Sequence, residues 1–390
     1  MRRRVVVSGI GVVSSLGPDL ASTCAAIEAG RSAVRPTCPD SAVAVAPRTA
    51  EVLDFEARPH FRLAKALKLT NRPTQFAVAA ASMALDASGW PIDPDAMRDV
   101  GVVIGSSGFD PRAADLTRAV GYDPDGRTLS DLPYFAERML SSLNPLWLLI
   151  GLPNMTSSHV AIQLRAHGPN SSIMNDSVAG VQSLGEATDW IRNGEAVAVL
   201  AGGADSAIYP HACASYAQAG LLATTSAGPP AFVPGEGGAI LLLEEREHAV
   251  ARGAAIHGEI CGYGSASASA VAPGALDLTM SAALADAAWA PAMIGVVGSS
   301  LLPVRRAADL ERAALARVLG PGATEIQRVE YQAQLGHALA AAGAIDMAVL
   351  LALHARTEPR GILFNTMGFS GQAVTLALVG PQTARHEERR

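Results

Sequence analysis

The sequence predicts an α/β protein whose sheets are covered by helices on both faces. Short, nearly continuous apolar runs alternate with alanine-rich stretches of helical length. Side chains along a strand point alternately to its two faces, so a strand that is apolar throughout is buried on both sides. Alternation of such strands with helices then favours layers of helix and sheet. Abundant alanine and glycine, with few aromatic residues (5%), suit close approach between the layers.

The individual elements are expected at apolar and alanine-rich runs of the 390-residue chain. Strands are expected at residues 5–7, 102–104, 196–200, 240–243, 256–260, 294–297, 362–364 and 374–379. Helices are expected at residues 19–28, 76–87, 180–192, 310–318 and 343–356. The same order of strand, small residues and helix recurs, which indicates a duplicated topology. We divide the chain at the charged stretch 244–252, into an N-terminal half (1–250) and a C-terminal half (251–390).

Composition and charge argue against several classes of protein. The net charge of −6 and the pI near 5.9 are unlike the basic surface that nucleic-acid binding favours. Ser8 and Gly9 interrupt the apolar run at the N-terminus, so it is too short for a signal peptide. No uninterrupted apolar run approaches the roughly 18 residues that span a membrane. We therefore expect a cytoplasmic protein that binds neither nucleic acid nor membrane.

Cysteine usage and glycine-rich segments give no sign of a cofactor. The cysteines are scattered without metal-ligand spacing, and we expect free thiols at Cys24, Cys38, Cys213 and Cys261. Gly202 and Gly203 lack the spacing of a dinucleotide fingerprint. No metal or flavin signature is present, so no cofactor is expected.

Four sequence blocks, taken together and in order, resemble the β-ketoacyl synthases of the elongating type. They are RVVVSGIG at 4–11, FVPGEGGA at 232–239, GHAL at 336–339 followed by AAG at 341–343, and NTMGFSG at 365–371. The spacing agrees from about residue 3 to residue 380. The resemblance implies the duplicated five-layer αβαβα thiolase fold, normally as a dimer.

That family uses a cysteine thiolate that takes the acyl chain from an acyl carrier protein. The cysteine lies at the N-terminus of a buried helix, where the helix dipole favours the thiolate. Here the matching turn reads MNDSVAG, and Ser177 stands in the place of the cysteine. A serine hydroxyl is a much weaker nucleophile unless a base takes its proton.

The other chemical positions of the family are also altered. Two histidines and a lysine normally stabilise the charge that develops as malonyl loses CO₂ and attacks. Counting back from Glu311, which matches a family glutamate, places Ser300 at the first histidine. Gln332 replaces the lysine, and His337 alone is retained. Because losing one oxyanion donor costs about 10²–10³ in rate, condensation by this chain alone is not expected.

Two further positions match the family. Asp346 matches a second outer acid, and Phe369 matches the gate phenylalanine beside the pocket. The resemblance thus implies an acyl pocket at Ser177, His337 and Phe369. Phe369 is open to two interpretations, as a lining of the acyl tunnel or as ordinary core.

The pattern resembles the chain-length factor of type II polyketide synthases, which lacks the cysteine. It implies a heterodimer with a cysteine-bearing ketosynthase, in which this chain shapes the acyl tunnel and the partner condenses. The familiar aromatic-polyketide members carry glutamine where this chain has Ser177. Residues 144–149 and 152–155 instead resemble the subunits of aryl-polyene and other highly reducing systems. The acyl chain length, starter unit and product are not revealed by the sequence.

Two other functions stay open. Ser177 could be an acylated nucleophile of an acyltransferase or thioesterase, with His337 as its base, or merely the N-cap or an inert filler of the helix that begins there. His337 could stabilise an oxyanion, or be retained because it bonds to backbone and packs in the pocket. The chain could also be a homodimeric acyl-binding relic without a partner.

Two surface features have a functional and an ordinary interpretation. Basic residues at helical spacing form a stripe that could dock an acidic carrier protein or be a solvated face: Arg58, Arg62, Lys65, Lys68 and Arg72. We take Arg62, Lys65 and Lys68 as the docking candidates. The apolar cluster at 147–150 could lie against a partner subunit or in the core. The turn-rich segment 121–132 and the polar tail 382–390 are expected to be exposed.

Overall fold

The computed structural model describes residues 2–41, 43–107, 133, 136–137, 145–222, 232–268, 274–302, 305–354 and 360–381. The strands are β1 (Val5–Ser14), β2 (Arg35–Pro36), β3 (Arg48–Thr49), β4 (Val100–Ser106), β5 (Asn170–Met174), β6 (Ala198–Ser206), β7 (Glu236–Glu245), β8 (Gly258–Ser267), β9 (Ile294–Leu301), β10 (Gln327–Val329), β11 (Gly361–Met367) and β12 (Gln372–Val379). The α-helices are α1 (Leu20–Glu28), α2 (Arg72–Ser88), α5 (Trp147–Gly151), α6 (Asn154–Leu164), α7 (Ala179–Asn193), α8 (Pro210–Gln218), α9 (Arg246–Ala251), α10 (Ala275–Asp286), α11 (Arg305–Leu319), α12 (Gln332–Leu335) and α13 (Ala342–Leu353). Short 3₁₀ helices are η1 (Arg58–His60), η2 (Ala64–Leu69), η3 (Asp176–Val178), η4 (Pro291–Met293), η5 (Gly320–Glu325) and η6 (Leu339–Ala341).

The sheet consists of two sets of strands with the same internal order. Its overall order is β10-β9-β11-β12-β8-β1-β7-β6-β4-β5. Read outward from the centre, β1-β7-β6-β4-β5 repeats as β8-β12-β11-β9-β10. In each set the first two pairings are antiparallel and the last two are parallel. The sets meet where Val5 of β1 lies opposite Ile260 of β8. This repetition confirms the duplicated α/β fold.

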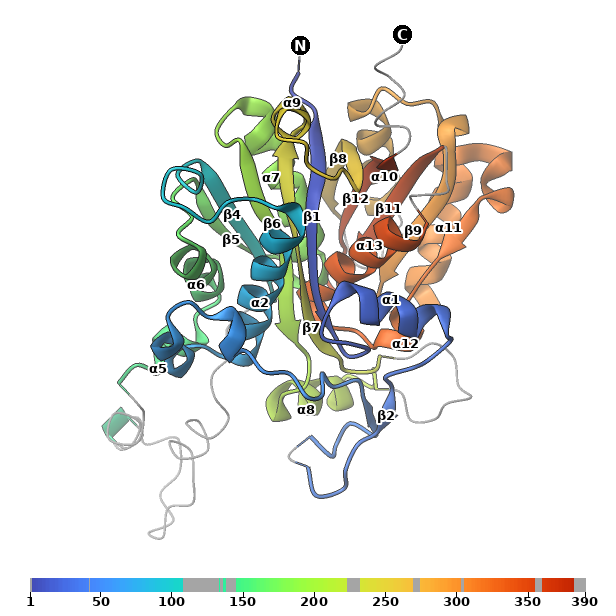
Figure 1. Cartoon of the computed structure of the whole chain (residues 1–390). Helices are drawn as coiled ribbons and strands as arrows, with labels where there is room; N and C mark the ends of the chain where they lie inside the picture. Colours follow the sequence, from blue (N-terminus) through green and yellow to red (C-terminus); the bar gives the residue numbers. More distant parts are fainter. Residues whose placement is uncertain are drawn as a thin grey trace.

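Helices cover the two sets and fill the space between them. The core around α7 and α13 includes side chains from both sets of strands, such as Val103 and Val296. A second core packs α2 and α6 against the first set, and a third packs α10 and α11 against the second. In Figure 1 α2 and α6 lie toward one side of the molecule and α11 toward the other. The result is the five-layer αβαβα arrangement of the thiolase fold.

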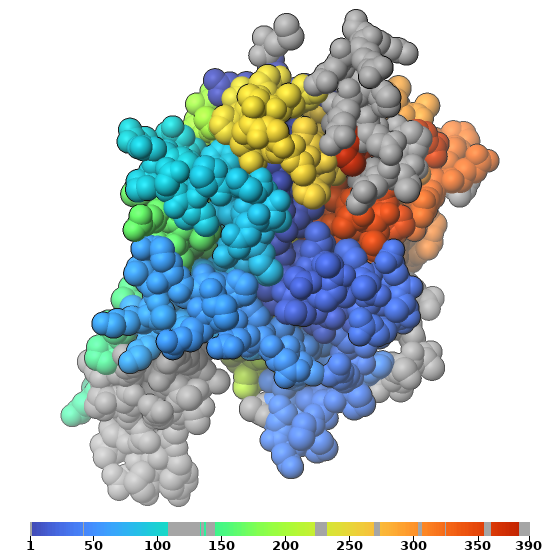
Figure 2. All heavy atoms as spheres, in the orientation of Figure 1, coloured from blue at the N-terminus to red at the C-terminus, as the bar shows by residue number. Residues whose placement is uncertain are grey.

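An N-terminal segment of the chain packs against the C-terminal half. Helix α1 contacts α13, and the Ala33 N–H donates to the Gln334 carbonyl at 2.8 Å. Figure 2 shows the dark-blue surface of this N-terminal segment directly beside the orange-red surface of the C-terminal half. The division into 1–250 and 251–390 stays our proposal for the domain boundary.

The basic segment departs from the prediction. It does not form one α-helix with a single basic face, because it is divided between η1, η2 and the start of α2. Phe61 is buried between η1 and η2 and turns the chain inward. Arg72 lies in α2, where its guanidinium makes a bidentate ion pair with Glu236.

Several predictions fall on residues outside the described part of the chain. These are the loop 121–132, the tail 382–390 and the first residue of the block 144–149. Among the residues that are described, no helix is both long enough and apolar enough to cross a membrane.

Candidate functional site

The nucleophile turn, residues 174–180, lies between β5 and the buried helix α7. Ser177 is in η3 with only 1% of its surface exposed. Its hydroxyl donates to Asp176 Oδ1 at 3.0 Å. Helix α7 has Val178 as its N-cap residue and receives no side-chain capping bond. The N-cap interpretation of Ser177 is therefore wrong, because its hydroxyl is bonded to the neighbouring carboxylate instead.

The gate turn, residues 368–371, lies against this nucleophile turn. The Phe369 N–H donates to Asp176 Oδ2 at 2.5 Å. The half-buried Phe369 ring lies 5.9 Å from that of Phe232 and 6.3 Å from that of Tyr216, between centroids. The structure thus brings Ser177 and Phe369 together through Asp176. Sequence analysis missed Asp176, although an acidic residue directly before the nucleophile position was a visible signal.

His337 lies between α12 and η6, and 1% of it is exposed. Its Nδ1 accepts the Leu339 N–H at 3.1 Å, and its ring lies 5.2 Å from the Phe232 ring. Burial lowers the pKa of His337 to about 4, so the imidazole is neutral at pH 7. Since Nδ1 is an acceptor, the proton belongs on Nε2, which is buried without a partner among the described residues. His337 can therefore donate a hydrogen bond from Nε2, but Nε2 cannot accept a proton.

Ser300 and Gln332 lie in contact in a second buried group. Gln332 Nε2 donates to Ser300 Oγ at 2.8 Å, and both side chains lie against the Asp346 carboxyl. Burial raises the pKa of Asp346 to about 7, while the bonds from Ser300 and Gln332 act in the opposite direction. Ser300 also lies opposite Thr366 in the β9–β11 pairing. The two substituted family positions are thus neutral neighbours of one buried acid.

Glu311 has a structural role in the same half. It is fully buried and accepts hydrogen bonds from Ser299 at 2.6 Å and Asn365 at 3.0 Å. Arg328 forms an ion pair with its other oxygen. The carboxylate is thereby held by three partners that join α11 to the strands beneath it.

The cysteine nearest to the gate is not activated. Cys213 on α8 belongs to the same small core as Phe232 and Leu339. Burial raises the pKa of its thiol to about 11, and its Sγ donates to the Ala207 carbonyl at 3.6 Å. A thiol with that pKa is protonated at pH 7 and is a poor nucleophile. Within the described ranges, no group of three or more His, Cys, Asp or Glu side chains could hold a metal ion.

The docking candidates lie on the surface near η2. Lys65 and Lys68 are exposed. Arg62 is also exposed, but its guanidinium donates to the carbonyls of Gln163 and Ile162 on α6. The three residues therefore share a surface region, in which Arg62 is partly engaged by the fold.

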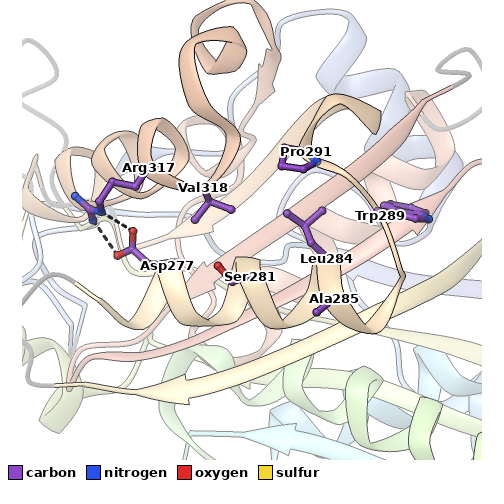
Figure 3. Close-up of a pocket in the computed structure, with 8 residues that line it drawn as sticks. All are labelled: Asp277, Ser281, Leu284, Ala285, Trp289, Pro291, Arg317 and Val318. Atoms are coloured by element: carbon purple, nitrogen blue, oxygen red, sulfur yellow. Dashed lines mark hydrogen bonds and ion pairs between the residues drawn. The ribbon is translucent and has the colours of Figure 1, made fainter.

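A surface groove of about 720 Å³ lies away from these groups, between α10 and α11 (Figure 3). Leu284, Trp289 and Val318 supply apolar walls, and Arg317 pairs with Asp277 at 2.6 Å across one end. None of the predicted site residues lines it, so this groove is not the candidate site.

Comparison with known proteins agrees with this arrangement. Residues 2–249 match the beta-ketoacyl synthase N-terminal domain, and residues 248–365 match the C-terminal domain. The chain is 30% identical over 384 residues to "3-oxoacyl-[acyl-carrier-protein] synthase 2" of Coxiella burnetii, covering 92% of this chain and 87% of that protein. It is 28% identical to the protein of the same name from Synechocystis, covering 96% and 98%.

Solved structures give the same result for the fold. The structure described as the ishigamide ketosynthase/chain length factor has a TM-score of 0.80 and 27% identity, covering 97% of this chain and 100% of that chain. A type II polyketide synthase acyl-carrier protein in complex with its ketosynthase gives a TM-score of 0.77 at 24% identity, covering 97% and 100%, and supports the fold alone. With both domains matched over most of its length, this chain belongs to the β-ketoacyl synthase family.

Proposed function

We propose that this chain is the non-condensing, chain-length-factor-like subunit of a heterodimeric β-ketoacyl-ACP synthase. A cysteine on the partner chain condenses, and this chain shapes the acyl tunnel in type II polyketide, polyene or fatty-acid-like synthesis. The observation that carries the proposal is the nucleophile turn. Ser177 lies there at the start of a buried helix, with its hydroxyl bonded to Asp176 and no activated thiol beside it.

The second buried group supports the same role. Ser300 and Gln332 hydrogen-bond to each other, and neither carries a proton that titrates near pH 7. They cannot supply the charge that a lysine and a histidine provide in the family. The ishigamide structure is described as a ketosynthase/chain length factor, which supports a subunit of that kind.

A Ser177-dependent acyltransferase or thioesterase is less well supported. Such an enzyme needs a base that takes the serine proton. Within the described residues no hydrogen bond joins Ser177 to His337, and the Nδ1 acceptor of His337 is occupied by the Leu339 N–H. His337 fits the packing role, because it bonds to backbone and packs on Phe232.

A partner surface is available at the end of the sheet. β5 is the terminal strand, and its residues are exposed or half-buried. Met174 at its end is 60% exposed, and Leu148 of the neighbouring α5–α6 segment is 46% exposed. Ser172 of β5 donates to the Pro153 carbonyl at 3.4 Å, which ties that segment to the strand. A strand edge that no other described strand pairs with, beside apolar side chains, suits a protein–protein interface.

The carrier protein is the second proposed partner. Acyl carrier proteins are acidic, and the exposed Lys65 and Lys68 would attract one electrostatically. A carrier-protein complex has been solved for a ketosynthase of the same fold.

Native mass spectrometry tests the proposed role. This chain is co-expressed with the nearest cysteine-bearing ketosynthase and mixed with acyl-loaded carrier protein. We expect a one-to-one complex that carries acyl mass only on the partner, with the same result for Ser177→Ala. Acyl mass on this chain that Ser177→Ala abolishes would favour the serine enzyme. A homodimer that ignores the ketosynthase would favour an acyl-binding relic.

Restoring the nucleophile provides a separate test. We expect Ser177→Cys alone to give no condensation of malonyl and acyl carrier proteins, because Ser300 and Gln332 remain. Product formation at a rate comparable to that of an intact ketosynthase would overturn the proposal.

A further inference from the structure

Asp176 joins the two turns of the candidate site. Its Oδ1 accepts the Ser177 hydroxyl at 3.0 Å, and its Oδ2 accepts the Phe369 N–H at 2.5 Å. We propose that Asp176 is a positioning residue that keeps this site closed, by tying the gate turn to the nucleophile turn and by placing a fixed negative charge beside position 177. The inference deepens the proposed function and rests on it, because it names a further feature that opposes condensation at this site.

The backbone at Asp176 supports a specific role for this side chain. Its φ is 55°, in the left-handed region that residues with a Cβ rarely adopt. Such a conformation persists where surrounding contacts require it. Here the contacts are those of the carboxylate, because both of its oxygens are hydrogen-bonded to the adjoining turns.

The carboxylate is closely packed against the gate turn. A Cβ added to Gly368 would lie 2.9 Å from Asp176 Oδ2, closer than real Cβ contacts allow. The gate turn is itself closed by the Gly368 N–H, which donates to the Gln372 carbonyl at 2.8 Å. Glycine at 368 is therefore what lets the backbone of the gate turn reach the carboxylate.

The charge of Asp176 reaches the aromatic side chains of the gate. Burial raises the pKa of Tyr216, and the charges of Asp205 and Asp176 raise it further. The Tyr216 ring in turn stacks near Phe369. The carboxylate thus lies among the side chains of the gate.

An anion at this place acts against a nucleophile at 177. The N-terminus of α7 favours nearby negative charge, and Asp176 already supplies one. A thiolate at the adjoining position would be a second negative charge, which raises the pKa of the thiol. The Phe369 N–H is also occupied, so it cannot donate to an incoming carbonyl oxygen.

Thiol reactivity in the isolated chain tests the electrostatic part. Three proteins are compared: Ser177→Cys, Ser177→Cys with Asp176→Asn, and Ser177→Cys with Asp176→Ala. Alkylation of position 177 by iodoacetamide is followed between pH 5 and 10 by peptide mass spectrometry, which separates it from the exposed Cys38. We expect Asp176→Asn to lower the pKa of the new thiol by about 1–2 units and to raise its alkylation rate at pH 7 about tenfold or more.

The matched control is Asp205→Asn in the Ser177→Cys protein. Asp205 is a buried acid near Tyr216 that accepts backbone N–H bonds from Ser107 and Ser206 rather than a bond from Ser177. We expect it to change the alkylation rate at position 177 much less than Asp176→Asn does. Equal effects of the two substitutions would overturn the assignment to Asp176.

Hydrogen exchange tests the positioning part. In Asp176→Ala the Phe369 amide loses its acceptor, and its exchange is expected to rise about tenfold, whereas Asp176→Asn keeps an acceptor oxygen and most of the protection. Near-UV circular dichroism establishes whether each variant is folded. If Asp176→Ala is not folded, the alkylation rate of the protein with Asp176→Asn decides the test. Unchanged alkylation and unchanged exchange in folded variants would overturn the inference. Neither measurement needs the ketosynthase or carrier protein, so the proposed function can fail separately.

Discussion

At the scale of single residues, Asp346 is a buried acid that no cation pairs with among the described residues. It is 2% exposed and lies against the neutral side chains of Ser300 and Gln332. Burial raises its pKa to about 7, so the folded state holds a proton that the unfolded chain releases near pH 4. The stabilising contribution of this proton is complete below about pH 4 and is lost as the pH rises through about 7.

Asp346→Asn removes that titration while keeping the shape of the side chain. We expect the free energy of unfolding of the variant, relative to the natural protein, to rise by up to about 1.4 kcal/mol per pH unit between about pH 4 and 7. Because burial lowers the pKa of His337, this residue reduces the free energy of unfolding as the pH falls below about 6.5. Both proteins contain His337, so its contribution cancels in the difference between them. Urea unfolding at several pH values measures the difference, and parallel curves would contradict the prediction.

Gln332→Lys is expected to weaken the pH dependence that Asp346 causes. An ammonium group in place of the amide would lie beside the carboxyl and lower its pKa by about 1–3 units. The loss of stability between pH 4 and 7 should then shrink. Gln334→Lys is the control, because Gln334 bonds to the carbonyls of Ile27 and Arg31 rather than to Asp346. An unchanged pH profile in Gln332→Lys would show that the new charge does not reach Asp346.

Much of this chemistry could be read from residue types alone, but the contacts could not. Motif spacing identified Ser177, Ser300, Gln332 and His337 as the positions of interest. Their contacts depend on three-dimensional placement: Gln332 reaches Ser300 because α12 lies beside β9 in the fold. The N-cap expectation for Ser177 failed because a closer acceptor, Asp176, takes its hydroxyl.

At the scale of elements, small residues set the distance between the buried helices and the strands. Gly180 of α7 faces the turn at η6, and an added Cβ would lie 2.2 Å from the Ala340 carbonyl oxygen. We expect Gly180→Ala to destabilise the fold by about 1–3 kcal/mol or more, because backbone on both sides would have to move. Gly322→Ala is the control, since nothing lies within 4 Å of its added Cβ, and we expect a change within about 0.5 kcal/mol. Thermal unfolding compares the two, and equal losses would contradict this packing argument.

Apolar periodicity predicted the buried elements well and the surface elements poorly. The predicted strands overlap β1, β4, β6, β7, β8, β9, β11 and β12, and the predicted helices overlap α1, α2, α7, α11 and α13. β5 reads NSSIM and was missed, because an edge strand that is half-exposed lacks an apolar run. The helical spacing of the basic residues did not correspond to one helix, because charge spacing does not reveal that Phe61 turns inward.

At the scale of the whole molecule, the two ends of the sheet differ in how they can bind another chain. β10 ends one side with three residues, whereas β5 ends the other beside exposed apolar side chains on the α5–α6 segment. A stable interface buries at least about 1,000 Å² and has an apolar centre. Met174 and Leu148 can supply such a centre, and a second sheet edge can pair with the side of β5 that no described strand occupies.

Met174→Asp is expected to abolish the proposed complex with a cysteine-bearing ketosynthase. A charge at the centre of an interface is desolvated without a partner when the complex forms, whereas in the free chain the same side chain is in water. The unfolding temperature of the free chain should therefore stay nearly constant. Leu278→Asp is the matched control, because Leu278 on α10 is also 60% exposed but belongs to the opposite half. Co-purification with the ketosynthase that survives Met174→Asp but is lost in Leu278→Asp would move the interface from the β5 edge to the helices of the C-terminal half.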